Sequence, residues 1–532
     1  MESNDLMVIL AMVIYFVVVL AVGFSYAKRS NSSTDEYFIG GRKVGPWFTA
    51  LSAEASDMSG YLLMGIPGLA YFYGASEAMW TCIGLAIGTY LNWLFVAKRL
   101  RQYSERVHAI TLPSFFSNRF HDKKNVLSTV AALIILLFFC VYTGSCFVTC
   151  GKLFHTLFGI DYVVMMIVGA VVVFAYTLVG GYLSVVATDF IQGCLMFFAL
   201  AVVLIGSITS VGGVDVTVAF LQNIPGFLNG TQLTTPILDA QTGMQLSDGN
   251  TPLFGESTDF GVLTIISTLA WGLGYFGMPQ VLVRFLGIRS AEEVRQSRII
   301  AVVWVVISMV CALCIGFIGR AMLPTYFGTN AAAENIFIVI AQMILPAFMC
   351  GVVVSGILAA SMSSASSYLL ITGSSVAENI FRGVFKRDAT DKQVMVVSRI
   401  TLLVVMLIGI FIAADENSVI FRVVSYAWAG LGASFGPLML CSLYWRRTNK
   451  QGALAGMLGG ALTVVVWHNF IKPLGGVFGI YELLPAFIVS LLCIFVVSKL
   501  TAEPSDEIYE EFDHYKEARM DEDVNPSGAA QA

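Results

Sequence analysis

The sequence predicts an all-α polytopic membrane protein with about thirteen transmembrane helices. The prediction rests on its composition, its long apolar runs and its distribution of basic residues. Hydrophobic residues make up 57% of the 532 residues and charged residues only 12%. A water-soluble globule of this length needs more polar surface than that. Each apolar run is long enough to cross a hydrocarbon core about 30 Å thick as a helix.

The predicted spans follow one another along the chain with short connections, apart from one long loop. They cover residues 6–27, 46–71, 76–97, 126–151, 162–183, 188–211, 260–285, 299–322, 345–376, 396–414, 419–445, 452–471 and 480–499. Residues 1–500 are therefore predicted to form one transmembrane domain, followed by an acidic cytoplasmic tail over 501–532. The loop 209–259 contains no Lys or Arg and is rich in Gly, Asn, Thr and Pro, which predicts an irregular external segment.

The basic residues predict the orientation of these spans. Of the 30 Lys and Arg residues, all but Lys152, Arg320, Arg422 and Lys472 fall on one side of the predicted membrane. Basic loops resist translocation, so that side is cytoplasmic. A missed or invented span would erase this asymmetry. The N-terminus is therefore predicted outside and the C-terminus inside.

The second span is interrupted by polar and small residues between Ala50 and Gly68. Asp57 lies eleven residues past Pro46, roughly 16 Å into the membrane at 1.5 Å per residue. An acid at the centre of a spanning helix costs about 2.5–3.5 kcal/mol and therefore indicates a functional site. A satisfied structural acid is the alternative. The neighbouring Ser56, Ser59 and Gly60 favour a broken helix that frees backbone carbonyls, as in secondary transporters.

A second interruption occurs in the seventh span, where Trp271 and three glycines over 272–277 precede Pro279. Trp271 lies eleven residues past Phe260, at the same depth that Asp57 has past Pro46. Two spans broken at equal depth and five spans apart predict an inverted repeat of spans 2–6 (46–211) and 7–11 (260–445). Glycines that serve only close helix packing are the alternative.

The ninth span carries small and hydroxyl-bearing residues on one helical face. They are Gly356, Ala360, Ser363, Ser364 and Ser367. Tight packing with back-bonded serines is one explanation. Beside an unwound second span, however, these hydroxyls and freed carbonyls form an all-oxygen cage suited to Na⁺. The ten cysteines fall in or beside apolar spans and the five histidines form no metal motif, so neither a cofactor nor an enzymatic activity is predicted.

Three aromatic residues lie near the predicted breaks: Tyr142 in the fourth span, and Trp271 and Tyr275 in the seventh. Core packing, an interfacial belt and ligand contact all remain open for them.

Several motifs together resemble a known family. They are ALSAEASDMSGYLLMG, GGYLSVVATDFIQ, WGLGYFGMPQVLVRF, ILAASMSSASS and SYAWAGLGASFGP. They are similar to the signatures of the sodium/solute symporters, and most closely to the bacterial proline transporters among them, from about Val18 to Ser498. The resemblance implies a thirteen-helix fold of the leucine-transporter type. It also implies Na⁺-driven uptake of L-proline by alternating access across the plasma (inner) membrane.

The resemblance also implies site residues. Sodium ligands would be the backbone of Ala55, Met58 and Ala360 and the hydroxyls of Ser363 and Ser364; residues linked to coupling would be Asp57, Asp189 and Arg42. Substrate contacts would come from Ser59, Gly60, Tyr61, Tyr142, Trp271, Tyr275 and Pro279. The chain departs from the family pattern at Tyr61, Ser364 and Ala187, where Trp, Thr and Trp are usual.

The predicted partners are L-proline, Na⁺ and the lipid bilayer, with no nucleic acid; the sequence leaves the oligomeric state open. Within the family, pantothenate, a sugar or another amino acid is the alternative solute. Outside it, a transporter-like sensor or a channel is the alternative. A sensor normally carries a signalling domain, which the 32-residue tail is too short to supply.

Overall fold

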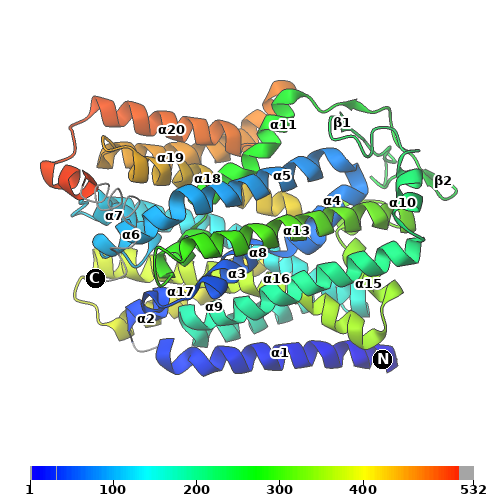
Figure 1. Cartoon of the computed structure of the whole chain (residues 1–532), viewed down its shortest axis with the longest axis horizontal. Coiled ribbons are helices and arrows are strands. Elements are labelled where there is room, and N and C mark those ends of the chain that lie inside the picture. Colours follow the sequence, from blue (N-terminus) through cyan, green and yellow to red (C-terminus); the bar gives the residue numbers. More distant parts are fainter. Residues whose placement is uncertain (1–2, 31–32, 514–532) are drawn as a thin grey trace.

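The computed structural model describes residues 3–30 and 33–513 as a bundle of helices that run side by side along the longest axis of the molecule (Figure 1). Long apolar helices of this kind satisfy every backbone hydrogen bond within the segment, which a bilayer requires. Helix α1 (Ser3–Ser30) begins at one end of the bundle and α20 (Leu483–Leu500) finishes at the opposite end. The chain therefore crosses the bundle an odd number of times.

The helices of the first half follow the predicted spans closely. After α1 come α2 (Thr34–Ile39), α3 (Pro46–Asp57), α4 (Ile66–Tyr73), α5 (Ala75–Asn92), α6 (Lys98–Arg106), α7 (Leu112–Arg119), α8 (Val126–Phe158) and α9 (Tyr162–Val211). A π-helical turn, Tyr61–Gly65, leads into α4, and another, Trp93–Ala97, joins α5 to α6.

The second half has the same helical character. It contains α10 (Val214–Leu221), α11 (Val262–Leu269), α12 (Pro279–Gly287), α13 (Val294–Met322), α14 (Asn330–Ala333), α15 (Ile336–Ile344), α16 (Ala347–Ser374), α17 (Asp391–Ile412), α18 (Ile420–Tyr444) and α19 (Lys450–Val466) before α20.

Both predicted breaks are present. Helix α3 ends at Asp57, and Met58 leaves the helical region with φ −81 and ψ 73 before the chain resumes as the turn Tyr61–Gly65. The seventh span consists of α11, a 3₁₀ segment Ala270–Gly277 and α12, and it bends by 41°. Pro279 stands at the first position of α12, where its missing N–H removes no helical bond.

The number of spans is only partly established. Ten helices among the described residues are individually long and apolar enough to cross a membrane, and the bent α11–α12 pair is an eleventh. The predicted second and fifth spans consist of shorter apolar pieces, α3 with 61–73 and residues 162–178. Helix α9 continues through the predicted loop at 183–188, but Gly181, with φ 62 and ψ −173, breaks it just before that loop. Thirteen spans therefore stay a prediction.

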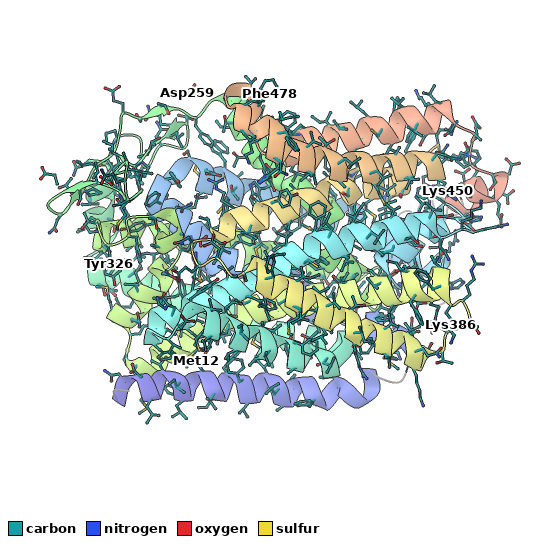
Figure 2. The ribbon with its side chains drawn as sticks, turned by 180° about the vertical axis from the view of Figure 1, so that it is seen from behind. Met12, Asp259, Tyr326, Lys386, Lys450 and Phe478 are labelled. Carbon is teal, nitrogen blue, oxygen red and sulfur yellow. The ribbon has the colours of Figure 1, made fainter. Side chains whose placement is uncertain are left out.

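The two ends of the bundle differ in structure and charge. Figure 2 shows Lys386 and Lys450 at one end, which we name the basic end, and Asp259 and Tyr326 toward the other, the loop end. The strands β1 (Gln232–Leu233), β2 (Ser247–Asp248), β3 (Thr251–Pro252) and β4 (Thr258–Asp259) lie in the long loop, where β1 pairs with β4 and β2 with β3, both antiparallel. Apart from these two-residue strands and the apolar helix α10, the loop is irregular, as predicted.

The described part of the acidic tail is ordered against the basic end. Residues 506–513 are helical, and Ile508 and Phe512 are buried. The ring of Phe512 lies 5.1 Å from the guanidinium carbon of Arg119. Residues 514–532 of the predicted tail lie outside the described residues.

Candidate functional site

The break after α3 frees backbone carbonyls beside α16. In a continuous helix the carbonyl of Ala55 would accept the N–H of Ser59, but that N–H donates to the backbone carbonyl of Asp57 instead, at 3.0 Å. The Met58 carbonyl loses its helical donor in the same way, because the N–H of Leu62 donates to Ser59 at 3.1 Å. The end of α3 thus presents two carbonyl oxygens inside the bundle that lack their helical N–H donors.

The serine face of α16 meets these oxygens. The hydroxyl of Ser363 donates to the Ala55 carbonyl at 2.7 Å and lies 3.1 Å from the carbonyl of Ala360. The hydroxyl of Ser364 lies 3.5 Å from the same Ala55 oxygen. All of these residues are buried. The structure therefore brings four of the five predicted sodium ligands together, and the freed carbonyl of Met58 lies in the same break.

Asp57 joins the two broken spans. Its carboxylate is fully buried and accepts hydrogen bonds from the Tyr275 hydroxyl at 2.7 Å and from the Gln280 amide at 3.1 Å. Both donors belong to the seventh span. Gln280 is not among the predicted site residues; the available signal was a lone amide in an otherwise apolar run directly after Pro279.

Aromatic rings surround the second break. The ring of Trp271 stacks on Tyr481 at 5.0 Å and lies 6.5 Å from the ring of Tyr61. Trp428 donates its indole N–H to the Trp271 carbonyl at 2.9 Å and meets Tyr275 edge-on at 5.0 Å. The predicted residues Tyr61, Trp271 and Tyr275 thus share one aromatic cluster. Trp428 and Tyr481 also belong to it, although the sequence analysis did not predict them.

A second set of predicted substrate residues consists of Tyr142, which belongs to α8, and of Ser59 and Gly60 in the break after α3. Tyr142 stacks on Tyr368 at 4.4 Å, and the buried hydroxyls of Tyr142, Tyr368 and Ser59 have no hydrogen-bond partner among the described residues. At Gly60, an added Cβ would lie 2.1 Å from the Thr149 hydroxyl, so α8 packs too closely for any side chain. Orphaned buried hydroxyls beside close-packed backbone are typical of an unfilled polar site.

Asp189 lies one layer away, toward the basic end. Its carboxylate accepts hydrogen bonds from Ser52 at 2.7 Å and from Arg284 at 3.0 Å. Arg284 also donates to the hydroxyl of Ser367 and to the backbone carbonyl of Gln280. From the sequence, Arg284 was expected only as one of the basic residues on the cytoplasmic side. In the structure its side chain is buried. Through Gln280 this ion pair is connected to Asp57.

Arg42 does not join the sodium residues. Its guanidinium donates to the carbonyls of Leu286 at 2.8 Å and Ala109 at 2.7 Å, and to the Ser104 hydroxyl at 3.1 Å. These bonds tie the end of α12 to α6 and to the segment that follows α6. A role of Arg42 in coupling would therefore act through the position of α12.

A buried ion pair also closes the loop end. Lys152 of α8 lies 2.7 Å from Glu334, whose carboxylate accepts the N–H groups of Ile420 and Phe421 at the start of α18. The backbone of Glu334 packs on Gly68, where an added Cβ would lie 2.8 Å away. Glu334 thereby connects the segment before α15 to α4, α8 and α18.

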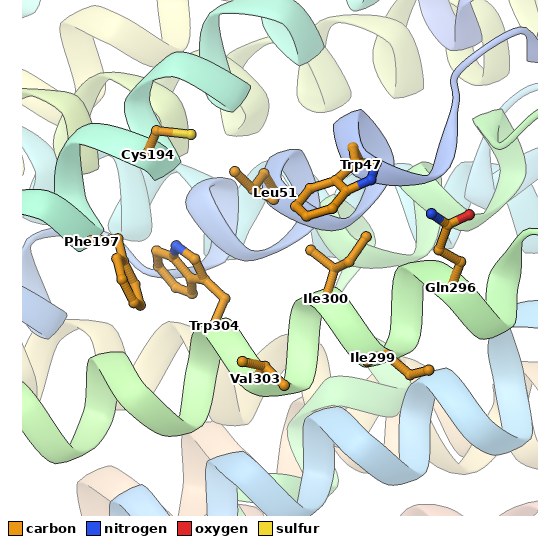
Figure 3. A pocket seen from close by; sticks show the side chains of 9 residues that line it. All are labelled: Trp47, Leu51, Cys194, Phe197, Gln296, Ile299, Ile300, Val303 and Trp304. Atoms are coloured by element: carbon orange, nitrogen blue, oxygen red, sulfur yellow. The ribbon is translucent and has the colours of Figure 1, made fainter.

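A large apolar groove lies apart from these residues (Figure 3). Its lining consists of Trp47, Leu51, Cys194, Phe197, Gln296, Ile299, Ile300, Val303 and Trp304, from α3, α9 and α13. None of the predicted site residues lines it. A nearly unbroken apolar lining suits hydrocarbon contact rather than a zwitterionic or cationic ligand.

Comparison with known proteins gives a consistent result. The model of the sodium:solute symporter family matches residues 37–460. Sodium/proline symporters of Staphylococcus aureus, strains JH9 and NCTC 8325 among them, are 41% identical over 498 residues, covering 92% of this chain and 92% of the relative.

Two solved structures share the fold. A Na⁺-coupled sialic acid symporter, in a substrate-bound outward-open state, aligns with a TM-score of 0.74 at 20% identity over 94% of this chain and 99% of that one. Mhp1, a nucleobase-cation-symport-1 family transporter, aligns in a closed conformation with a TM-score of 0.50 at 14% identity over 90% and 98%. At these identities the likeness shows the leucine-transporter-type fold alone.

Proposed function

Because the chain belongs to the sodium:solute symporter family, a family of Na⁺-coupled membrane transporters and not of enzymes, we propose that it takes up L-proline with Na⁺ by alternating access. The observation that carries the proposal is the oxygen cage at the end of α3. There the Ala55 carbonyl faces the hydroxyls of Ser363 and Ser364 beside a buried Asp57. Oxygen ligands at a helix break suit a small hard cation.

The proposed sodium ligands are Ala55, Met58, Ala360, Ser363 and Ser364, with Asp57 next to them. Asp57 is held by Tyr275 and Gln280 of the other broken span. A cation bound at the end of α3 would therefore act electrostatically, through Asp57, on Tyr275 and Gln280 of the seventh span. We assign Asp189 to the next layer, where it positions Arg284 and through it Gln280.

L-Proline is proposed on the strength of the 41% identical relatives and of the aromatic cluster. Tyr61, Trp271 and Tyr275 would enclose the apolar pyrrolidine ring, and Tyr142, Ser59, Gly60 and Pro279 would complete the pocket. The unpaired hydroxyls of Tyr142 and Ser59 supply polar contacts for the carboxylate or ammonium group. Another amino acid, pantothenate or a sugar is the competing solute.

Two buried ion pairs suit alternating access. Lys152–Glu334 closes the bundle at the loop end and Arg284–Asp189 closes it at the basic end. We propose that each opens in turn, with spans 2–6 and 7–11 acting as inverted repeats of a thirteen-span protein. The basic end would face the cytoplasm, and the N-terminus the outside of the plasma membrane.

The driving force is sufficient for this activity. One positive charge gains about 2.3 kcal/mol per 100 mV, and a tenfold Na⁺ gradient adds about 1.4 kcal/mol. Together, about 3.7 kcal/mol concentrates a neutral solute several hundredfold at equilibrium.

Uptake of labelled proline into proteoliposomes tests the function. An inward Na⁺ gradient should drive accumulation, whereas an equal K⁺ gradient should not. A tenfold excess of unlabelled proline should remove most of the signal, and the same excess of pantothenate, glucose or alanine should leave most of it. If labelled proline does not accumulate under the Na⁺ gradient and labelled pantothenate, glucose or alanine does, that solute replaces proline as the substrate. Proline flux that needs no gradient and does not saturate would indicate a channel.

A further inference from the structure

The apolar groove of Figure 3 is open to the surroundings of the bundle and enclosed on three sides by α3, α9 and α13. It has a volume of about 610 Å³. Its lining includes Ile299 and Val303, which are 56% and 53% exposed. On a spanning helix such exposed apolar side chains face the hydrocarbon of the bilayer. A groove walled by three helices gives an acyl chain many more contacts than a single convex helix does.

One end of the groove lies at the membrane surface of the basic end. Helix α13 finishes at the long loop, where Arg320 donates to Gln245 at 2.7 Å, so its first turn lies at the basic end. In that turn, the hydroxyl of Ser297 donates to the carbonyl of Pro46, the first residue of α3, at 3.1 Å. Residues 299–319 carry no charge and span roughly 30 Å, the thickness of the hydrocarbon core.

From this surface the groove runs inward. Figure 3 shows Trp47 and Gln296 toward one end of it and Phe197 and Trp304 toward the other. Trp304 lies five residues past the start of the uncharged stretch, roughly 8 Å into the hydrocarbon. Its indole N–H donates to the carbonyl of Gly193 at 3.2 Å, which fixes the ring. The groove thus has the depth and direction of an acyl chain in the leaflet at the basic end.

Three side chains with N–H donors stand at the surface end of the groove. Trp47 and Gln296 line it, and Arg295 lies one turn before Ile299 on the same helical face. All three are polar at their tips, and none makes a hydrogen bond or ion pair with the residues that the structure describes. Donors of this kind, next to an apolar groove, suit a ligand with a charged oxygen-rich end and a hydrocarbon body.

The other charged groups near this end have partners elsewhere. Arg289 is bonded to Glu293, and Glu292 is attracted to basic residues of α6. The guanidinium of Arg298 lies over the ring of Tyr90, on α5, at 5.7 Å. Arg295 is exposed and is therefore accessible to an anion at the groove mouth.

We propose that this groove is a binding site for a membrane phospholipid. One acyl chain lies along the groove, and the phosphate accepts hydrogen bonds from Arg295, Gln296 and the indole of Trp47. Arginine binds phosphate through two parallel N–H groups, and tryptophan is enriched at the level of the headgroups. The apolar walls exclude the phosphate from the inner part of the groove, so the two ends of the lipid have distinct sites.

The bound lipid would act on the first broken span. Leu51 lines the groove, and the next residue, Ser52, donates to the carboxylate of Asp189 at 2.7 Å. A chain packed between α3 and α13 therefore holds α3 in the position in which the Arg284–Asp189 pair closes the basic end. This role rests on the proposed alternating access, whereas binding of the lipid does not.

Native mass spectrometry of the purified full chain in dodecyl maltoside, titrated with dioleoylphosphatidylglycerol, tests the site. The maltoside headgroup carries no phosphate, so it does not compete for Arg295. One phospholipid should bind to the wild type before all others. Dioleoylglycerol has the same chains but no phosphate, and it should bind at least roughly tenfold more weakly, about 1.4 kcal/mol.

Two pairs of variants separate the groove from the rest of the apolar surface. Val303→Trp fills the groove and should remove the first phospholipid. Val404→Trp places the same ring on α17, at a position that is 46% exposed and lies outside the groove, so binding should be unchanged. Arg295→Gln should weaken the first phospholipid roughly tenfold, about 1.4 kcal/mol. Arg387→Gln, at another exposed arginine, should leave it unchanged.

Wild-type phospholipid affinity in Val303→Trp or in Arg295→Gln would overturn the site, and so would equal affinity for dioleoylglycerol. A dimeric chain that binds no phospholipid ahead of the others would mean that a second copy covers the groove, which also overturns it. If Val303→Trp does not fold, Arg295→Gln decides, because its side chain is exposed. No transport is measured, so absence of proline uptake would contradict the proposed function and leave this result unaffected.

Discussion

The two broken spans are interrupted at the same depth but contribute different chemistry. In the first, α3 stops at Asp57 and the next residues abandon helical hydrogen bonding, which exposes the carbonyls of Ala55 and Met58. In the second, the chain tightens into the 3₁₀ segment Ala270–Gly277 and bends by 41° before α12. A 3₁₀ turn keeps i→i+3 hydrogen bonds, so it frees few carbonyls.

The two spans therefore contribute different chemical groups to the site. The first span supplies charge and backbone oxygens, which are what a cation needs. The second supplies donors to that charge, from Tyr275 and Gln280, and the aromatic wall around Trp271. The comparison predicts that substitutions in the first span and its α16 partner change Na⁺ dependence. Substitutions in the wall should change solute dependence.

The largest effect is expected from Asp57→Asn. The substitution is nearly isosteric but removes the negative charge beside the cage, so half-maximal uptake should need at least thirtyfold more Na⁺, about 2 kcal/mol. Uptake measured against Na⁺ concentration checks it, with membrane levels as the control for insertion. Unchanged uptake at limiting Na⁺ would contradict the assignment of the ion site to the first span.

Trp271→Ala is expected to act on the solute instead. The ring stacks on Tyr481 and faces Tyr61, so its loss should raise the proline concentration for half-maximal uptake roughly tenfold, at least about 1.4 kcal/mol. Proline binding at saturating Na⁺ measures this directly. Normal membrane levels with unchanged proline affinity would place the solute elsewhere and favour another substrate.

Ser363→Ala and Ser364→Ala should each raise the Na⁺ requirement by a smaller factor, roughly fivefold or about 1 kcal/mol. Ser363 should have the larger effect, because its hydroxyl lies 2.7 Å from the Ala55 carbonyl and that of Ser364 lies 3.5 Å away. Proline dependence at saturating Na⁺ should shift less. If Na⁺ and proline affinities fell equally in both variants, the serine face would serve packing.

The smallest effect is expected from Tyr61→Trp. Tyr61 is one wall of several, and a single apolar difference in a pocket is worth about 1–3 kcal/mol only when no neighbour compensates. The indole also restores the residue usual in the family's proline transporters. Proline uptake should stay within about threefold of wild type. Its complete loss would mean that the wall beside Trp271 is too tight for the larger ring.

Much of this architecture could be predicted before the structure. Pro46, Asp57, Trp271 and Pro279 marked both breaks, because an acid or a Gly–Pro cluster has few structural reasons to occur inside a membrane span. The serine face of α16 followed from helical spacing. Gln280 and Arg284 could not be assigned in this way, because their partners Asp57 and Asp189 lie 223 and 95 residues away along the chain.

By itself, the sequence determined that the chain spans a membrane many times, where two spans break and which helix face carries hydroxyls. Hydropathy, helical periodicity and backbone propensity are local properties. Only the tertiary structure decided that Tyr275 and Gln280 hold Asp57, that Arg42 is bonded to Leu286 and Ala109, and that α3, α9 and α13 line one apolar groove. Hydrogen bonds and charge balance in a low-dielectric interior depend on which helices pack together. That packing cannot be predicted from the sequence of any one helix alone.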